Sequence, residues 1–295
     1  MKQALASGVG SSLRSTEFEM SDRDFKDIAG MLYADAGIYM PESKTTLVYS
    51  RLVKRLRALH LENFRQYCDL VGSPDGSGER REMLSALTTN VTRFFREPHH
   101  FEHLSAHVLP PLLELARRGG RVRLWSAACS TGPEPYSMAL TVLGLEPNAA
   151  SLDIRILASD IDPRVVEEGR RGVYPVAALA EAPAALRKRY FSGVGGDERR
   201  GLQASDELRR LVVFRTLNLN ANWPMPGKFH VIFCRNVVIY FDEQTQQAVW
   251  SKFAGKLEPG GVLYIGHSER VTGPAVARFV SDGVTAYRLK EGYGA

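Results

Sequence analysis

The chain has 295 residues, 44% of them hydrophobic and 24% charged, with a net charge of +5. This balance is typical of a soluble globular protein with one large domain or two smaller ones, and the mild positive charge permits an acidic partner without requiring one. No uncharged apolar run reaches the roughly 18 residues that a membrane helix needs, so we expect no membrane insertion.

The N-terminal third shows only helical patterns. Residues 1–18 are rich in Ser, Gly and Ala, lack the apolar core of a signal peptide, and are expected to form a flexible tail. Beyond them, apolar residues recur at helical spacing, as in Val48, Leu52, Leu56 and Leu59. Because no strand pattern occurs before residue 120, the sequence predicts a small all-helical domain over residues 19–88.

Strand and helix patterns alternate from Arg121 onward, which predicts an α/β domain over residues 89–295 with a mainly parallel sheet and helices on both faces. A hairpin is expected at the end, over residues 278–289, turning at Asp282-Gly283. Residues 174–210 are rich in glycine and charge and interrupt the alternation, so they are expected to form an inserted subdomain.

The stretch RVRLWSAACSTGPEPY, residues 121–136, organises this domain. It combines a short apolar strand, a turn of small residues and the start of an apolar helix. Small side chains let a ligand lie against the backbone, where free N–H groups of the helix face it. Only Gly132 of the dinucleotide glycine pattern is present, and Glu134 would repel a phosphate, so we expect a ligand with a cationic end.

Four acidic or amide side chains follow predicted strands, where α/β sheets bind ligands: Glu134, Asp160, Asn218 and Asn236. Asp160 is placed where a carboxylate typically accepts ribose hydroxyls; the alternative is that it caps the next helix, although Asp162 is the better cap. Glu134 has the alternative of a solvated first-turn carboxylate, and Asn218 that of a residue shaping a turn.

Other polar residues have simple alternatives. Arg235 could form a surface ion pair, Tyr240 could be a core residue within its apolar run, and Cys234 is interpreted as a buried thiol. The three cysteines are sparse and lack zinc spacing, which suits a reducing cytosol and a cytoplasmic protein. Adjacent histidines point in different directions and no carboxylate cluster accompanies them, so we expect no metal at His99, His100 and His103.

Five stretches resemble CheR-type chemoreceptor glutamate O-methyltransferases: LTTNVTRFFREPHHF, VRLWSAACSTGPEPYSMA, ASDIDPRVVEEGRRGVY, VIFCRNVVIYFD and LEPGGVLYIGHSE. The resemblance spans nearly the whole chain and implies a Rossmann-like methyltransferase domain with a small β-subdomain, behind the helical domain. It further implies methyl transfer from S-adenosylmethionine, which leaves S-adenosylhomocysteine, to glutamates of a chemoreceptor cytoplasmic domain in chemotactic adaptation. We expect a monomer and no nucleic-acid partner.

The resemblance also implies roles for individual residues. Cofactor contacts are expected at Asn90, Thr92, Arg96, Glu134, Asp160, Asn218, Leu219, Arg235 and Asn236. Arg96 and Tyr240 match positions near the transferred methyl group and are the expected catalytic residues. Receptor docking is expected on the basic helix that carries Arg51, Lys54, Arg55 and Arg57, whose charged edge is predicted to lie in solvent.

Two positions depart from the family pattern. Pro133 stands where the family usually has the first Glu of Gly-Glu-Glu-Pro, but Glu134 keeps the second, so cofactor binding is expected to survive. His230 stands where an Asp is common. Residues 174–210 correspond to a β-subdomain that some members use to hold a receptor C-terminal peptide, although their sequence diverges from that of the family.

Two other function classes compete with this reading. A methyltransferase acting on nucleic-acid bases needs a polar-Pro-Pro-aromatic pattern that CRNVVIY lacks, and a small-molecule enzyme would not need the basic helix. A cofactor-binding module without turnover would be favoured if Arg96 or Tyr240 were absent, and both are present.

Overall fold

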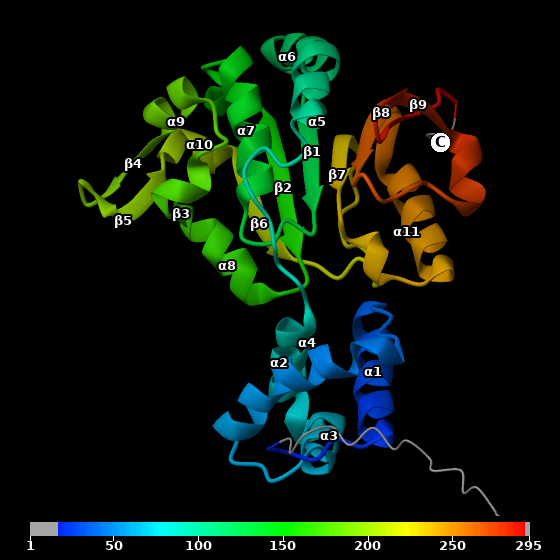
Figure 1. The fold of residues 1–295 in the computed structure, drawn as a ribbon. Helices are drawn as coiled ribbons and strands as arrows, with labels where there is room; N and C mark the ends of the chain where they lie inside the picture. The colour runs from blue at the N-terminus through cyan, green and yellow to red at the C-terminus, as the bar shows by residue number, and fades with distance from the viewer. Residues whose placement is uncertain (1–16, 293–295) are drawn as a thin grey trace, which may run out of the picture. The chain divides into compact units, whose positions relative to one another are not determined.

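The computed structural model describes residues 17–292, so nearly all of the predicted tail, residues 1–18, lies outside it. The chain forms two compact units (Figure 1). The first holds the described residues up to Met31 together with Pro41–Leu87, and the second holds Leu32–Met40 together with the chain from Thr88 onward. The domain limits 19–88 and 89–295 stay predictions, but Leu32–Met40, expected in the helical domain, groups with the second unit.

The first unit is helical, as predicted. Its helices are α1 (Asp22–Ala36, whose end belongs to the second unit), α2 (Thr45–Ala58), α3 (Phe64–Gly72) and α4 (Ser77–Leu87), with short 3₁₀ turns at Glu42–Lys44 and Pro74–Gly76. Ser21 and Asn63 begin two of these helices by accepting hydrogen bonds from backbone amides three residues later. The apolar stripe of α2 is buried at Val48, Leu52 and Leu56.

The second unit contains a seven-stranded sheet in the order β6-β2-β1-β7-β8-β10-β9. Its strands are β1 (Val122–Ala127), β2 (Ile154–Asp160), β6 (Val212–Thr216), β7 (Phe229–Cys234), β8 (Leu257–Ile265), β9 (Phe279–Gly283) and β10 (Ala286–Leu289). The first five pair in parallel, and the last two form an antiparallel hairpin at the edge. The predicted fold class is therefore confirmed.

The hairpin turn was predicted at Asp282-Gly283 and lies two residues later. Strand β9 continues through Gly283, which pairs with Ala286. The turn is therefore made by Val284 and Thr285, and Thr285 takes a left-handed φ of 52°. The Asp-Gly pair suggested a tight turn, but pairing with β10 keeps it within the strand.

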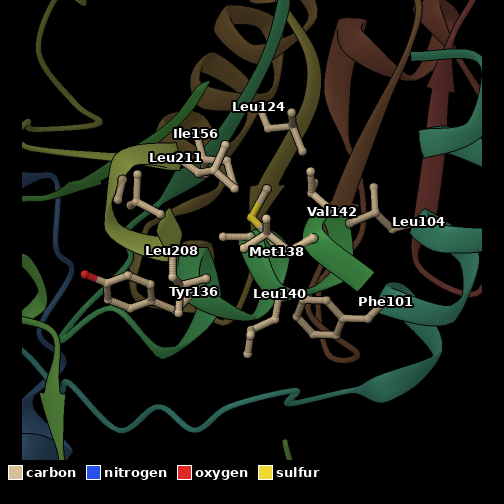
Figure 2. Packing of buried hydrophobic residues seen from close by; sticks show 14 of the residues in the cluster. Phe101, Leu104, Leu124, Tyr136, Met138, Leu140, Val142, Ile156, Leu208 and Leu211 are labelled. Atoms are coloured by element: carbon tan, nitrogen blue, oxygen red, sulfur yellow. The ribbon is translucent and has the colours of Figure 1, made fainter. Parts of the chain in front are cut away.

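Helices cover both faces of the sheet (Figure 1). They are α5 (Pro98–His103), α6 (Leu109–Arg117), α7 (Pro133–Leu145), α8 (Pro163–Arg171), α10 (Asp206–Leu211) and α11 (Glu243–Lys256), with a π-helical turn at Leu104–Val108 and 3₁₀ turns at Ala149–Ser151, Val238–Tyr240 and Gly273–Arg278. Two buried clusters result, one of which includes Trp125 and Trp250. In the other, Met138 and Val142 of α7 lie among residues of β1, β2 and α10 (Figure 2).

A second, three-stranded antiparallel sheet forms the small β-subdomain that was predicted. It contains β3 (Val173–Tyr174), β4 (Phe191–Val194) and β5 (Asp197–Ala204), in the order β3-β5-β4. The 3₁₀ turn Val176–Leu179 and helix α9 (Ala184–Tyr190) connect β3 to β4.

Candidate cofactor and acceptor site

The loop between β1 and α7 is strained and closely packed. Ala128 and Ser130 have positive φ angles of 62° and 51°, which are uncommon for residues with a side chain. Gly132 has a φ of 96°, and a Cβ there would lie 2.8 Å from the Tyr174 hydroxyl. Only glycine suits this position. Because strain of this kind persists mainly at functional sites, the loop is a good candidate for ligand binding.

Asp160 ends β2 and is almost fully buried. Its carboxylate accepts hydrogen bonds from the backbone amides of Ser130 at 2.8 Å and Asp162 at 3.0 Å. Burial raises the pKa of Asp160, against the lowering effect of these bonds. Asp162, not Asp160, caps α8 by accepting from the Arg164 amide at 2.9 Å. The capping alternative for Asp160 is thus wrong, and its carboxylate has room for further donors.

Glu134 and Arg235 form a buried ion pair. Glu134, in the first turn of α7, accepts from the Ser126 hydroxyl at 2.7 Å and from Arg235 Nε at 2.8 Å. It is only 8% exposed, so the alternative of a solvated carboxylate is wrong. The alternative of a surface ion pair for Arg235 is wrong for the same reason, since Arg235 is 7% exposed.

Arg235 also contacts the segment that carries three of the predicted cofactor contacts, Asn90, Thr92 and Arg96. Its Nη1 donates to the backbone carbonyl of Arg96 at 2.5 Å. The Ser130 hydroxyl donates to the Asn90 carbonyl at 2.9 Å from the β1–α7 loop. Thr92 and the Arg96 side chain are half-buried. The structure therefore brings this segment against the ends of both β1 and β7.

Asn218 shapes its own turn, as one alternative proposed. Its Oδ1 accepts from the Asn220 amide at 2.8 Å, and its Nδ2 donates to the Asp35 carbonyl at 2.6 Å. Leu219 beside it is buried. The contact with Asp35 holds the Leu32–Met40 segment to the loop after β6, a relationship that no local sequence pattern indicated.

Asn236 and Tyr240 lie in the loop that follows β7. Asn236 has a left-handed φ of 59°, and its Oδ1 is buried without a hydrogen-bond partner among residues 17–292. Tyr240 is 38% exposed, so the alternative of a core tyrosine is wrong. Its carbonyl accepts from the Tyr39 amide at 2.8 Å, and Ile38 forms a bridge with Phe241. The Leu32–Met40 segment thus borders the predicted acceptor residue.

Glu269 was missed by the sequence reasoning. It is 3% exposed and accepts hydrogen bonds from four backbone amides of the loops after β7 and β8. The available signal was its place in LEPGGVLYIGHSE, where a carboxylate closely follows an apolar strand.

A group of possible metal ligands, Glu97, His99 and His100, does occur, contrary to the expectation that no carboxylate accompanies the histidines. Glu97 has a left-handed φ of 57°. His100 Nε2 contacts the Thr285 hydroxyl at 2.7 Å, and its Nδ1 lies 3.2 Å from Arg235 Nη1. A guanidinium so close disfavours a cation at this position. The absence of a metal stays a prediction.

The charged edge of α2 does not lie wholly in solvent, and this prediction was wrong for two residues. Arg51 donates to the carbonyls of Ala86 and Leu87, at 3.3 and 3.0 Å. Arg55 pairs with Glu79 and Glu82 of α4. These two arginines are drawn from solvent because the last carbonyls of α4 have no partner within their own helix, and because α4 carries carboxylates beside α2. Arg57 pairs with Glu17, and Lys54 is exposed.

None of the helices in residues 17–292 has the length and apolar character of a membrane span.

Two family models match the chain: the CheR methyltransferase all-alpha domain over residues 23–88 and the CheR methyltransferase SAM binding domain over residues 90–285.

Curated relatives match over most of their length. A probable chemotaxis protein methyltransferase of Rhizobium etli is 59% identical, covering 88% of this chain and 96% of the relative. The chemotaxis protein methyltransferase of Escherichia coli is 41% identical, and the match covers 95% of each chain. That of Salmonella typhimurium is 39% identical, and the match covers 99% of each chain. The chain therefore belongs to the CheR methyltransferase family, whose members use S-adenosylmethionine to transfer methyl groups in chemotaxis.

Proposed function

We propose that this protein methylates glutamate side chains of a chemoreceptor cytoplasmic domain, forming glutamyl methyl esters. The observation that carries the proposal is the contrast between the buried carboxylates and the exposed tyrosine at the C-terminal edge of the sheet. Three carboxylates there, Glu134, Asp160 and Glu269, are buried and bonded to protein donors, whereas the Tyr240 side chain is exposed. The exposed Tyr240 hydroxyl is therefore available to donate to an incoming carboxylate, whereas these three carboxylates already accept hydrogen bonds from the protein.

The acceptor chemistry agrees with this contrast. A glutamate with a pKa of about 4.3 is ionised at neutral pH and can attack a methyl group without a base. The remaining task is alignment and exclusion of water. We assign the alignment to Arg96 and Tyr240, whose guanidinium and hydroxyl can each donate to a carboxylate.

The residues present fit S-adenosylmethionine. Asp160 retains acceptor capacity beyond its two backbone bonds, which suits ribose hydroxyls, and Asn236 Oδ1 is a buried acceptor that has no donor among residues 17–292. When bound, the cofactor supplies an electrophilic sulfonium methyl group. We propose that Asp160 and Asn236 contact it directly and that Glu134 contributes a favourable field for its cationic groups. Arg235 would hold Glu134 and the Arg96 segment in place.

The other predicted contacts fit less directly. Both Asn218 side-chain atoms already have protein partners, so its proposed contribution is the shape of the loop that carries Leu219. Asn90 and Thr92 are half-buried on the segment held by Ser130 and Arg235. We propose that these residues line the same cofactor site.

We propose that the receptor docks on α2. The contacts within the first unit reduce the number of α2 residues that are available for docking. Lys54 is exposed, whereas Arg51 and Arg55 are half-buried and bonded to α4. Lys54 is therefore the best candidate for contact with an acidic receptor, followed by Arg57, which is exposed but pairs with Glu17. We further propose that the protein acts as a cytoplasmic monomer, a setting consistent with three free buried cysteines.

The test is methylation of purified receptor cytoplasmic domains with cofactor carrying a labelled methyl group. Methyl esters release labelled methanol at alkaline pH, whereas methyl groups on nitrogen do not. We expect base-labile label, mapped by mass spectrometry to glutamates, and loss of labelling when those glutamates are changed to alanine. Base-stable label, or labelling of nucleic acid or small molecules alone, would contradict the proposal.

A further inference from the structure

Four backbone amides converge on the Glu269 carboxylate. Oε1 accepts from Val237 at 2.8 Å and Val238 at 3.0 Å. Oε2 accepts from Asn236 at 2.9 Å and Gly266 at 2.6 Å. Each carboxylate oxygen thus accepts two hydrogen bonds, and three of the four donor residues are consecutive in sequence.

The backbone is shaped for this contact. Asn236 is left-handed, with a φ of 59°, and Val237 follows with a φ of −119° and a ψ of −51°. Alternation of left- and right-handed residues turns successive N–H groups toward one point and forms an anion-binding concavity. The strained Asn236 conformation is costly for a residue with a side chain. The bonds to Glu269 offset that cost.

Gly266, at the end of β8, allows the approach. A Cβ there would lie 2.6 Å from Asn236 Nδ2 and 2.9 Å from Glu269 Oε2. Both distances are shorter than side-chain contacts allow, so any larger residue would push the loop away. The carboxylate thereby ties the end of β8 to the loop after β7.

An ordinary surface ion pair does not explain Glu269. Its exposed fraction is 3%, and within residues 17–292 its environment is set by burial and four backbone amides, with no cation paired to it. Burial raises the pKa of Glu269, while the four amides lower it. A buried carboxylate that is compensated by backbone dipoles alone is retained at a cost, which suggests that it does more than stabilise the fold.

We infer that Glu269 is a positioning residue that sets the Asn236–Tyr240 loop, and through it the Tyr240 hydroxyl, for methyl transfer. This inference rests on the proposed function, because it assumes that Tyr240 orients the acceptor. Tyr240 ends the 3₁₀ turn that begins at Val238, and the Val238 amide is held by Oε1. Displacement of this turn moves the hydroxyl away from the acceptor position.

The test is Glu269→Gln, which keeps the shape but replaces one acceptor oxygen by an NH₂ group. That group would face two backbone donors, so one pair of bonds must break. We expect faster hydrogen exchange by NMR at the amides of Asn236, Val237, Val238 and Gly266. We expect kcat to fall on the order of 10- to 100-fold, because small misplacements of reacting groups are costly. Glu102→Gln, an exposed glutamate of α5, is the matched control and should change neither quantity.

A double-mutant cycle separates positioning from general stabilisation. If Glu269 acts through Tyr240, then Tyr240→Phe should cost much less in the Glu269→Gln background than in the wild type. Additive losses would overturn the inference, as would unchanged kcat or unchanged amide exchange in Glu269→Gln. If that variant does not fold, Glu269→Ala with added formate is the second test. Formate should restore amide protection by occupying the concavity, and protection that does not respond would overturn the inference.

The proposed function can fail independently. If the wild-type protein methylates no receptor domain, the acceptor assignment is wrong whatever Glu269 does. The exchange measurement still tests whether the carboxylate holds the loop, since it needs no substrate. Receptor methylation by the wild type together with unaltered exchange in Glu269→Gln would reject the positioning role alone.

Discussion

Arg235 donates to Glu134 at 2.8 Å and to the Arg96 carbonyl, so one buried side chain joins the first turn of α7 to the segment before α5. Its guanidinium also lies over the rings of Phe101 and Phe233, at 5.5 and 5.4 Å from their centroids. These contacts fix the relative placement of the two parts of the site that are predicted to hold cofactor and acceptor.

Arg235→Ala should lower the free energy of unfolding by about 3–5 kcal/mol, because it leaves Glu134 buried without its cation. Urea denaturation followed by tryptophan fluorescence measures this, since all three tryptophans, Trp125, Trp223 and Trp250, lie in the second unit. The control is Arg199→Ala, which breaks an exposed pair with Asp197 and should cost less than about 1 kcal/mol. Equal losses would show that the buried pair has no special importance.

Asp160→Ala should weaken binding of S-adenosylhomocysteine by about 1.5–3 kcal/mol, because hydrogen bonds to a charged group are lost. Titration calorimetry measures the affinity. Asp162→Ala is the control: it removes the cap of α8, so it should reduce stability by roughly 1 kcal/mol with a smaller effect on affinity. Unchanged affinity in Asp160→Ala would reject the ribose assignment.

Tyr240→Phe should lower kcat by roughly 10- to 100-fold, the value of a hydrogen bond to a charged carboxylate. Affinity for S-adenosylhomocysteine and thermal stability should hold, because the side chain is 38% exposed. Steady-state kinetics with receptor domains and calorimetry test both parts. A matching loss of cofactor affinity would place Tyr240 in the cofactor pocket instead.

His100 should make the protein less stable as the pH falls. Burial, and then the nearby Arg235, lower the pKa of His100 from 6.5 to about 3. In the unfolded chain His100 is protonated below about pH 6.5, whereas in the folded protein it stays neutral down to about pH 3. The free energy of unfolding therefore decreases as the pH falls from 6.5 to 3. The loss should reach about 1.4 kcal/mol at pH 5.5 relative to pH 7.5. His100→Gln should lack this contribution, and urea denaturation at both pH values compares them. Parallel pH dependences would contradict the prediction.

Receptor docking should depend on Lys54. Lys54→Glu should raise KM for the receptor domain several-fold at low salt, and the difference from wild type should shrink as salt screens the charges. Arg118→Glu, an exposed cation of the second unit, is the control and should leave KM unchanged. Arg55→Glu is unsuitable because it breaks the pairs with Glu79 and Glu82. Equal KM values for wild type and Lys54→Glu would mean that docking lies elsewhere.

Local sequence patterns predicted most strands of the main sheet, its mainly parallel pairing, and the positions of Glu134, Asp160 and Asn236 after strands, but placed the hairpin turn two residues too early. These follow from local periodicity and from the rule that parallel strands present their carboxyl ends at one edge. Even the cap at Asp162 was readable, because a capping residue acts on amides two or three positions away.

The hydrogen-bond and ion-pair partners of these residues follow from tertiary packing. Arg235 meets Glu134 across 101 positions, and Arg51 meets the Leu87 carbonyl across 36. Glu269 gathers amides from a loop more than 30 positions away, and Tyr39 joins Tyr240 although the two lie in opposite halves of the chain. No local pattern encodes such contacts, because they depend on how strands and helices pack. The same packing buried charges that an isolated helix or strand would leave in water.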